Sequence, residues 1–124
     1  PSNAVFLHCI AEYPAKVEWS SMSSLQNLRR QFSHIGLSDH SRSDIPAIIA
    51  TAMGAVMIEK HITLTPGGDG LDDGFAIGPD DFAKFCASIH AAHSAMGLSA
   101  EPRRADVTHL PLRRSLYVVE PMRA

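Results

Sequence analysis

Three short segments of the sequence each place a histidine beside polar or acidic residues. Neutral imidazole is a common ligand of divalent metals, and a neighbouring carboxylate can act as a general base. Residues two apart in an extended chain face the same side, so side chains within one segment are expected to lie together. The three segments are His8 with Glu12 and Tyr13, Ser38-Asp39-His40, and Glu59-Lys60-His61.

A divalent metal held by His40 and His61 is the hypothesis that these segments favour. Two imidazoles with carboxylates nearby and open coordination positions are typical of a catalytic metal site, whereas structural sites are closed. The alternative is that one or both histidines form hydrogen bonds within a loop.

Other polar residues carry weaker signals. His90 and His93, three apart, could bind a metal or border the solvated face of a helix. Lys60 alternates with its neighbour Glu59 and is expected to be solvated or to support a nearby ligand. The two cysteines are far apart in the sequence and are expected to be buried, reduced thiols.

The segment 63–78 is rich in glycine and aspartate. Within it, the stretch 69–74 has Leu71 where a calcium loop needs a ligand, and no glutamate closes the loop. We therefore expect a mobile loop that covers a substrate.

Strands and helices alternate along the chain. This alternation implies right-handed crossovers and a parallel sheet or barrel, in which ligands bind at the carboxyl ends of the strands. The first strand is nearly continuous in apolar residues, as in a parallel strand covered on both faces. The predicted strands are 4–10, 34–38, 55–59 and 115–119, and the predicted helices are 20–32, 45–53 and 79–96.

Residues at the ends of the helices support these bounds. Asp44 is expected to cap the second helix, which Gly54 ends. Pro79 is expected to begin the last helix, since proline suits a first helical turn. This last helix is expected to bury Phe82, Phe85, Cys86, Ile89 and Met96.

Composition narrows the class of protein. A chain of 124 residues with 45% hydrophobic residues can form the core of one ordinary domain. The net charge of −2 argues against a nucleic-acid-binding protein, and no apolar run approaches the ~20 residues of a membrane helix. The first residues do not resemble a secretory signal, so a cytoplasmic protein is expected.

The motifs, taken together, resemble the sialic acid synthase family, which comprises N-acetylneuraminate synthases and relatives acting on other nonulosonic acids. The resemblance implies that the chain is the last three β/α units of a (β/α)₈ TIM barrel, incomplete in this chain. It implies a partial barrel domain over 1–98, then a linker over 99–124 that begins the connection to a missing antifreeze-like C-terminal domain. The matching segments are Leu7-His8-Cys9, Tyr13-Pro14, Gly36 to His40, Ile58 to His61, Thr63-Leu64, Asp72, Pro79 and Arg114 to Leu116.

The resemblance also implies an activity. Members of this family condense phosphoenolpyruvate with an N-acetylated aminosugar such as N-acetylmannosamine and release phosphate. A divalent metal, Mn²⁺ or Mg²⁺, is implied on His40 and His61. Glu59 matches a catalytic acidic residue that helps to place water or substrate.

Three further residues match substrate contacts of the family. Ser38 matches a residue near phosphoenolpyruvate, and Tyr13 and Asp72 match residues that contact the sugar. Ala11 stands where the family often has asparagine, which removes a possible polar contact to the substrate. The loop reads Asp69-Gly70-Leu71-Asp72 where Gly-Pro-Asp is usual in the family, which leaves the sugar specificity open. The lysines that bind phosphate in the family have no match here, so these residues alone are expected to be inactive.

The edges of the predicted sheet suggest an alternative function. Three β/α units leave unpaired strand edges, which favour a homo-oligomer. The alternative function is therefore a non-catalytic metal-binding or assembly module that folds only as an oligomer.

Overall fold

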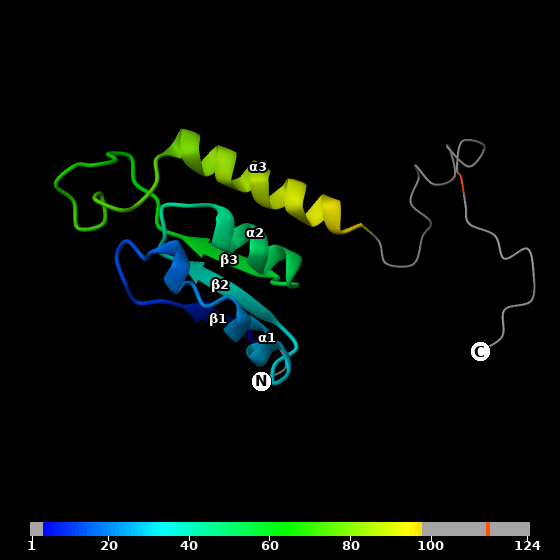
Figure 1. The fold of residues 1–124 in the computed structure, drawn as a ribbon. Coiled ribbons are helices and arrows are strands. Elements are labelled where there is room, and N and C mark those ends of the chain that lie inside the picture. The colour runs from blue at the N-terminus through cyan, green and yellow to red at the C-terminus, as the bar shows by residue number, and fades with distance from the viewer. Residues whose placement is uncertain (1–3, 98–113, 115–124) are drawn as a thin grey trace, which may run out of the picture.

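A computed structural model describes residues 4–97 and residue 114, and it shows strands alternating with helices (Figure 1). The three strands are parallel, in the order β1-β2-β3, as the alternation predicts. The predicted strand 115–119 and nearly all of the predicted linker 99–124 lie outside the described residues. The elements are β1 (Phe6–Cys9), a 3₁₀ helix (Val17–Trp19), α1 (Ser23–Arg29), β2 (Ile35–Asp39), α2 (Ile45–Ala52), β3 (Met57–Lys60) and α3 (Pro79–Met96).

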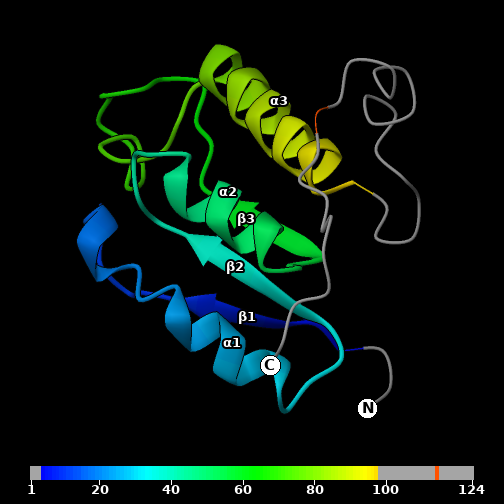
Figure 2. The same ribbon diagram turned by 45° about the vertical axis from the view of Figure 1, so that its right-hand side comes forward.

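The hydrophobic core lies on one face of the sheet. Ile35 and Leu37 alternate along β2, so both point to this face, and both are buried. All three helices contribute to the same cluster and therefore cover this face, which Figure 2 shows from a second side. The buried helix residues of the cluster are Leu25 from α1, Ala47 and Ala50 from α2, and Phe85 from α3.

The outer strands are less buried than the central one. Every residue of β2 is buried, whereas β1 and β3 each pair on one side only in the described part of the chain. Phe6 and Cys9 of β1 are exposed, so the predictions of a strand covered on both faces and of a buried Cys9 thiol are wrong. The apolar run does not reveal that β1 is an edge strand here. Both cysteines are free thiols, and Cys86 is partly buried.

The observed helix ends agree in part with those predicted from the sequence. Ser21 has a φ of 46°, a conformation incompatible with a right-handed helix, so α1 begins later than residue 20. Asp44 takes the N-cap position of α2, but its carboxylate makes no capping bond. Instead, the hydroxyl of Ser43 accepts a hydrogen bond from the Ile45 N–H at 3.2 Å. Gly54, at a φ of 89°, follows the end of α2 as predicted.

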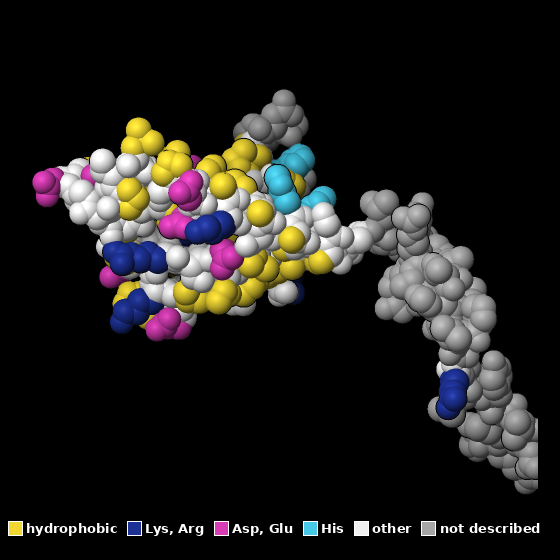
Figure 3. All heavy atoms as spheres, turned by 90° about the horizontal axis from the view of Figure 1, so that it is seen from above, with side chains coloured by type: hydrophobic (Ala, Val, Ile, Leu, Met, Phe, Trp, Pro, Cys, Tyr) yellow, Lys and Arg dark blue, Asp and Glu magenta, His cyan; other side chains and the backbone are white. Residues whose placement is uncertain are grey.

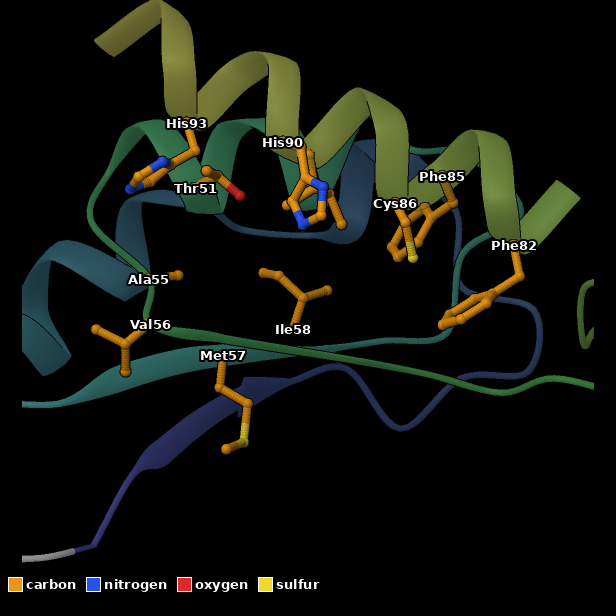
Figure 4. Close-up of a pocket in the computed structure, with 11 residues that line it drawn as sticks. Thr51, Ala55, Val56, Met57, Ile58, Phe82, Phe85, Cys86, His90 and His93 are labelled. Atoms are coloured by element: carbon orange, nitrogen blue, oxygen red, sulfur yellow. The ribbon is translucent and has the colours of Figure 1, made fainter. Parts of the chain in front are cut away.

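α3 begins at Pro79 as predicted, but it buries fewer residues than expected. Phe85 is buried, whereas Phe82 and Met96 are 36% and 57% exposed. A cavity of about 310 Å³ between α3 and β3 explains part of this exposure, because Phe82 lines it (Figure 4). His90 and His93 also project from α3 toward this cavity.

The surface over α3 carries acidic and basic side chains close to one another (Figure 3). Lys84 and Asp81 form an exposed ion pair there at 2.8 Å. Among the helices of residues 4–97, none combines the length and the apolar character that spanning a bilayer requires.

Candidate metal and substrate site

The carboxyl ends of β2 and β3 bring two of the histidine segments side by side. In the parallel register, Ser38 pairs with Glu59, and the strands end one residue later. His40 and His61 therefore leave the sheet at the same edge, with ring centroids 5.1 Å apart. These four residues form a common rim on the sheet face opposite the helices.

The ring of His40 is held by the chain that follows β1. Its Nδ1 lies 2.8 Å from the carbonyl oxygen of Ile10, an acceptor only, so Nδ1 carries the proton and donates it. The Nε2 atom of neutral His40 then has a lone pair, 3.4 Å from the hydroxyl of Ser38. That hydroxyl donates its hydrogen bond to Glu59, so the lone pair on Nε2 of His40 is left available.

The ring of His61 is held in a similar way by a carboxylate. Its Nδ1 lies 3.0 Å from Oδ2 of Asp72, in the loop between β3 and α3. Histidines that bind metals commonly donate one ring N–H to a carboxylate or a backbone carbonyl, which leaves the other nitrogen for the metal. Both His40 and His61 follow this pattern, and the side chain of His61 remains 34% exposed.

Glu59 is oriented by Ser38. The hydroxyl of Ser38 donates a hydrogen bond to Oε1 of Glu59 at 2.6 Å, the short distance expected for an acceptor that carries charge. Because Ser38 is buried, this bond holds the carboxylate against the sheet edge, beside the two histidines. The arrangement places a potential general base next to a pair of potential metal ligands.

Two aromatic side chains border the pair of histidines. Tyr13 stacks on His40 with centroids 4.2 Å apart and meets the edge of His61 at 5.9 Å. Phe75, from the loop 63–78, lies 5.1 Å from Tyr13 and 5.0 Å from His61. Phe75 is not among the site residues predicted from the sequence, although it is the only aromatic residue in this glycine-rich loop. An isolated aromatic residue there was the available signal.

The loop 63–78 is organised around Asp73. Its carboxylate accepts hydrogen bonds from the hydroxyls of Thr63 and Thr65 and from the Gly70 N–H. These bonds, the one from Thr63 first, lower the pKa of Asp73 below its ordinary range. Asp73 thus shapes the loop from within, while the adjacent Asp72 contacts His61.

Three residues of these segments, His8, Asp39 and Lys60, lie on the helix-covered face of the sheet instead. The ring of His8 is on the opposite face of the sheet, where Nε2 lies 2.7 Å from the carbonyl oxygen of Ser20. Lys60 is not solvated, because its side chain is 4% exposed and forms an ion pair with Asp39 at 2.7 Å. The sequence pattern shows the alternation of these residues, but it does not show which face the helices cover.

The donor set fits an open metal site. Within residues 4–97, no three His, Cys, Asp or Glu side chains converge on a common point, so His40 and His61 have no third ligand of these types in this part of the chain. Two neutral nitrogen ligands whose outer N–H groups are engaged suit a divalent metal that keeps other positions open. His90 and His93 have no third such ligand converging on them in the same range.

Comparison with known proteins places this site in a family. The NeuB family matches residues 1–101. N,N'-diacetyllegionaminic acid synthase of Campylobacter jejuni is 35% identical over 96 residues, covering 77% of this chain and 29% of the relative. Pseudaminic acid synthase of Helicobacter pylori is 34% identical over 120 residues, covering 92% of this chain and 34% of the relative.

Solved structures agree with these relatives. The N-acetylneuraminic acid synthetase of Leptospira borgpetersenii, crystallised with citrate, has a TM-score of 0.77 at 30% identity. The match covers 90% of this chain and 40% of that one. The spore coat polysaccharide biosynthesis protein SpsE of Bacillus subtilis has a TM-score of 0.69 at 34% identity. This match covers 74% of this chain and 26% of that one.

The chain is thus much shorter than the proteins that it matches, since it spans 29% and 34% of the two synthases. Its three parallel β/α units match part of the larger folds in the solved structures, which confirms the predicted fold class of an incomplete barrel. With residues 1–101 matched, the chain belongs to the NeuB family.

Proposed function

We propose that these residues are part of a nonulosonic acid synthase that condenses phosphoenolpyruvate with an N-acetylated aminosugar and releases phosphate. Membership of the NeuB family supports the proposal, because matched relatives are named as synthases of legionaminic and pseudaminic acids. The observation that carries it is the engagement of Nδ1 of His40 by Ile10 and of Nδ1 of His61 by Asp72. Both Nε2 atoms are thereby left free to bind a ligand.

In this proposal, His40 and His61 hold a divalent metal, Mn²⁺ or Mg²⁺. When bound, such a metal supplies Lewis acidity that polarises the carbonyl oxygen of an aldehyde substrate. The neutral imidazoles would leave most of the metal's charge available for this role. The aromatic rings of Tyr13 and Phe75 border one side of the pair.

The remaining residues of the rim bind and orient the reactants. The enol carbon of phosphoenolpyruvate attacks the aldehyde and leaves a cationic carbon, to which water adds before phosphate departs. Glu59, held by the Ser38 hydroxyl, accepts a proton from that water. Ser38 lies near the phosphoenolpyruvate, as the family resemblance implies. Tyr13, half exposed at the rim, contacts the sugar, and Asp72 orients His61 while it borders the sugar.

Phosphate release tests the proposed reaction. The complete protein that carries these residues is incubated with phosphoenolpyruvate, Mn²⁺ and a panel of N-acetylated aminosugars that includes N-acetylmannosamine. We expect turnover with at least one sugar and its loss in His40→Ala, while His34→Ala, at an exposed histidine, retains it. No turnover with any of the sugars would rule out the proposed reaction.

The 124 residues alone are proposed to be inactive, because this stretch has no match to the family's phosphate-binding lysines. Turnover by this stretch alone would contradict that statement.

A second candidate function follows from the edges of the sheet. Because β1 and β3 each pair on one side only within the described residues, this stretch could act as a metal-binding or assembly module that folds only as an oligomer. Analytical ultracentrifugation of this stretch tests this hypothesis, because a folded monomer would contradict it.

A further inference from the structure

A buried ion pair joins β2 and β3 directly beneath the two histidines. Nζ of Lys60 lies 2.7 Å from Oδ2 of Asp39, and the two side chains are 4% and 3% exposed. Asp39 and Lys60 are register partners and the last residues of their strands. Each immediately precedes one histidine of the pair, His40 or His61, but points to the helix-covered face of the sheet.

The ammonium group of Lys60 also binds the turn that contains His40. It donates hydrogen bonds to the carbonyl oxygens of Ser41 and Ser43 as well as to Asp39. The second oxygen of Asp39 accepts a hydrogen bond from the Ser41 N–H at 2.9 Å. A single cation at the end of β3 therefore organises the segment 39–43 at the end of β2.

An aromatic ring and low exposure keep this cation away from water. The ring centroid of Phe85, from α3, lies 5.1 Å from Nζ of Lys60. A buried ion pair is seldom the most stabilising choice, because apolar side chains of similar size often replace it without loss of stability. Apolar side chains, however, lack the directed bonds that hold a turn against one strand. The chemistry of the pair is therefore better suited to fixing geometry than to adding stability.

We infer that Asp39 and Lys60 are positioning residues that set the spacing of the His40 and His61 rings for a divalent cation. The β2–β3 ladder ends at these two residues, so the ion pair is the last side-chain link between the strands before the histidines. Neither residue reaches the rim, and each acts through the histidine that follows it. The inference rests on the metal site of the proposed function.

Titration of the complete protein with Mn²⁺ tests the inference by calorimetry and by the electron paramagnetic resonance spectrum of the bound ion. The main variant combines Asp39→Leu with Lys60→Met, which removes both charges together. We expect Mn²⁺ affinity to fall about 10–100-fold, the usual effect of losing support behind metal ligands. The melting temperature should stay near that of the wild type, and the spectrum of any bound Mn²⁺ should change.

A matched control uses the exposed ion pair of α3. Lys84 and Asp81 lie 2.8 Å apart, compared with 2.7 Å for the buried pair, but their side chains are 77% and 67% exposed. The combination of Asp81→Leu with Lys84→Met should leave Mn²⁺ affinity within about twofold of wild type, because exposed ion pairs contribute little to the stability of the surrounding structure.

The outcomes separate this inference from the proposed function. A wild type that does not bind Mn²⁺ overturns both. If the wild type binds Mn²⁺ and a folded double variant binds it with equal affinity and an unchanged spectrum, the positioning role alone is overturned.

If the double variant does not fold, the Asp39→Asn variant tests the positioning role instead, because it keeps the size of the side chain and an acceptor for the Ser41 N–H. A folded Asp39→Asn variant with weaker Mn²⁺ binding supports the inference. Equal binding, or failure of this variant to fold as well, overturns it.

Discussion

Nδ1 of His61 and Oδ2 of Asp72 lie 3.0 Å apart, which joins the end of β3 to the loop that precedes α3. The carboxylate accepts a hydrogen bond from the N–H at Nδ1, so the loop determines which ring nitrogen remains free. The adjacent Asp73 holds the loop from within. The orientation of a candidate metal ligand thus depends on the conformation of a segment far from the sheet core.

Replacing Asp72 should weaken metal binding without unfolding the protein. In Asp72→Ala, His61 loses its hydrogen-bond partner, and we expect Mn²⁺ affinity to fall about 10–100-fold. Calorimetric titration of the complete protein measures the change. Asp69→Ala, at an exposed aspartate of the same loop, serves as the control and should match the wild type. Equal affinities for all three proteins would show that Asp72 does not support the site.

Replacing Glu59 should reduce turnover much more than metal binding. In Glu59→Gln the side chain can still accept the hydrogen bond from Ser38, but it can no longer take up a proton. We expect kcat to fall by about 10²–10⁴-fold, as for the loss of a general base. Phosphate release measures this, with Glu12→Gln, at an exposed glutamate, as the control. A Glu59→Gln protein with wild-type kcat would exclude the assigned role.

The loop around Asp73 should loosen in acid. Its pKa is lowered first by the Thr63 hydroxyl, then by the Thr65 hydroxyl and the Gly70 N–H. Because the folded-state pKa lies below the unfolded value, the stabilising contribution is present above the ordinary aspartate range. That contribution is lost as the pH falls through the lowered pKa.

A carboxyl-carbon NMR titration checks this direction. Thr63→Val removes the largest cause, so the pKa of Asp73 should move back toward its ordinary value. Thr51→Val, which removes a hydrogen bond within α2, should leave the pKa of Asp73 where it is. A Thr63→Val protein with an unchanged pKa at Asp73 would refute this account of the loop.

Two leucines provide a test of the packing. Leu25 is fully buried in the core cluster, whereas Leu71 is 98% exposed in the loop. Leu25→Ala should lower the free energy of unfolding by about 2–5 kcal/mol, because it leaves a cavity. Leu71→Ala should change it by less than about 0.5 kcal/mol. Urea denaturation measures both, and similar losses for the two variants would contradict the described core.

Much of the fold could be predicted from local patterns. The alternation of apolar strands and amphipathic helices was enough to predict the parallel sheet, and Gly54 and Pro79 correctly marked helix boundaries. The start of α1 was predicted too early, because the positive φ of Ser21 has no clear signature in the sequence. The exposure of Met96 was also missed, since periodicity identifies an apolar face but not whether another element packs on it.

From the sequence one could predict that His40 and His61 follow two consecutive parallel strands and lie at the same edge of the sheet, because the alternation of strands and helices implies parallel strands whose carboxyl ends share one edge. Which ring nitrogens of these histidines stay free depends on contacts that form in the folded chain. That outcome depends on Ile10 and Asp72, whose positions are set by loops packing across the sheet edge. The burial of Lys60 against Asp39 was likewise decided by strand register and by helix cover, which are long-range interactions that no local spacing encodes.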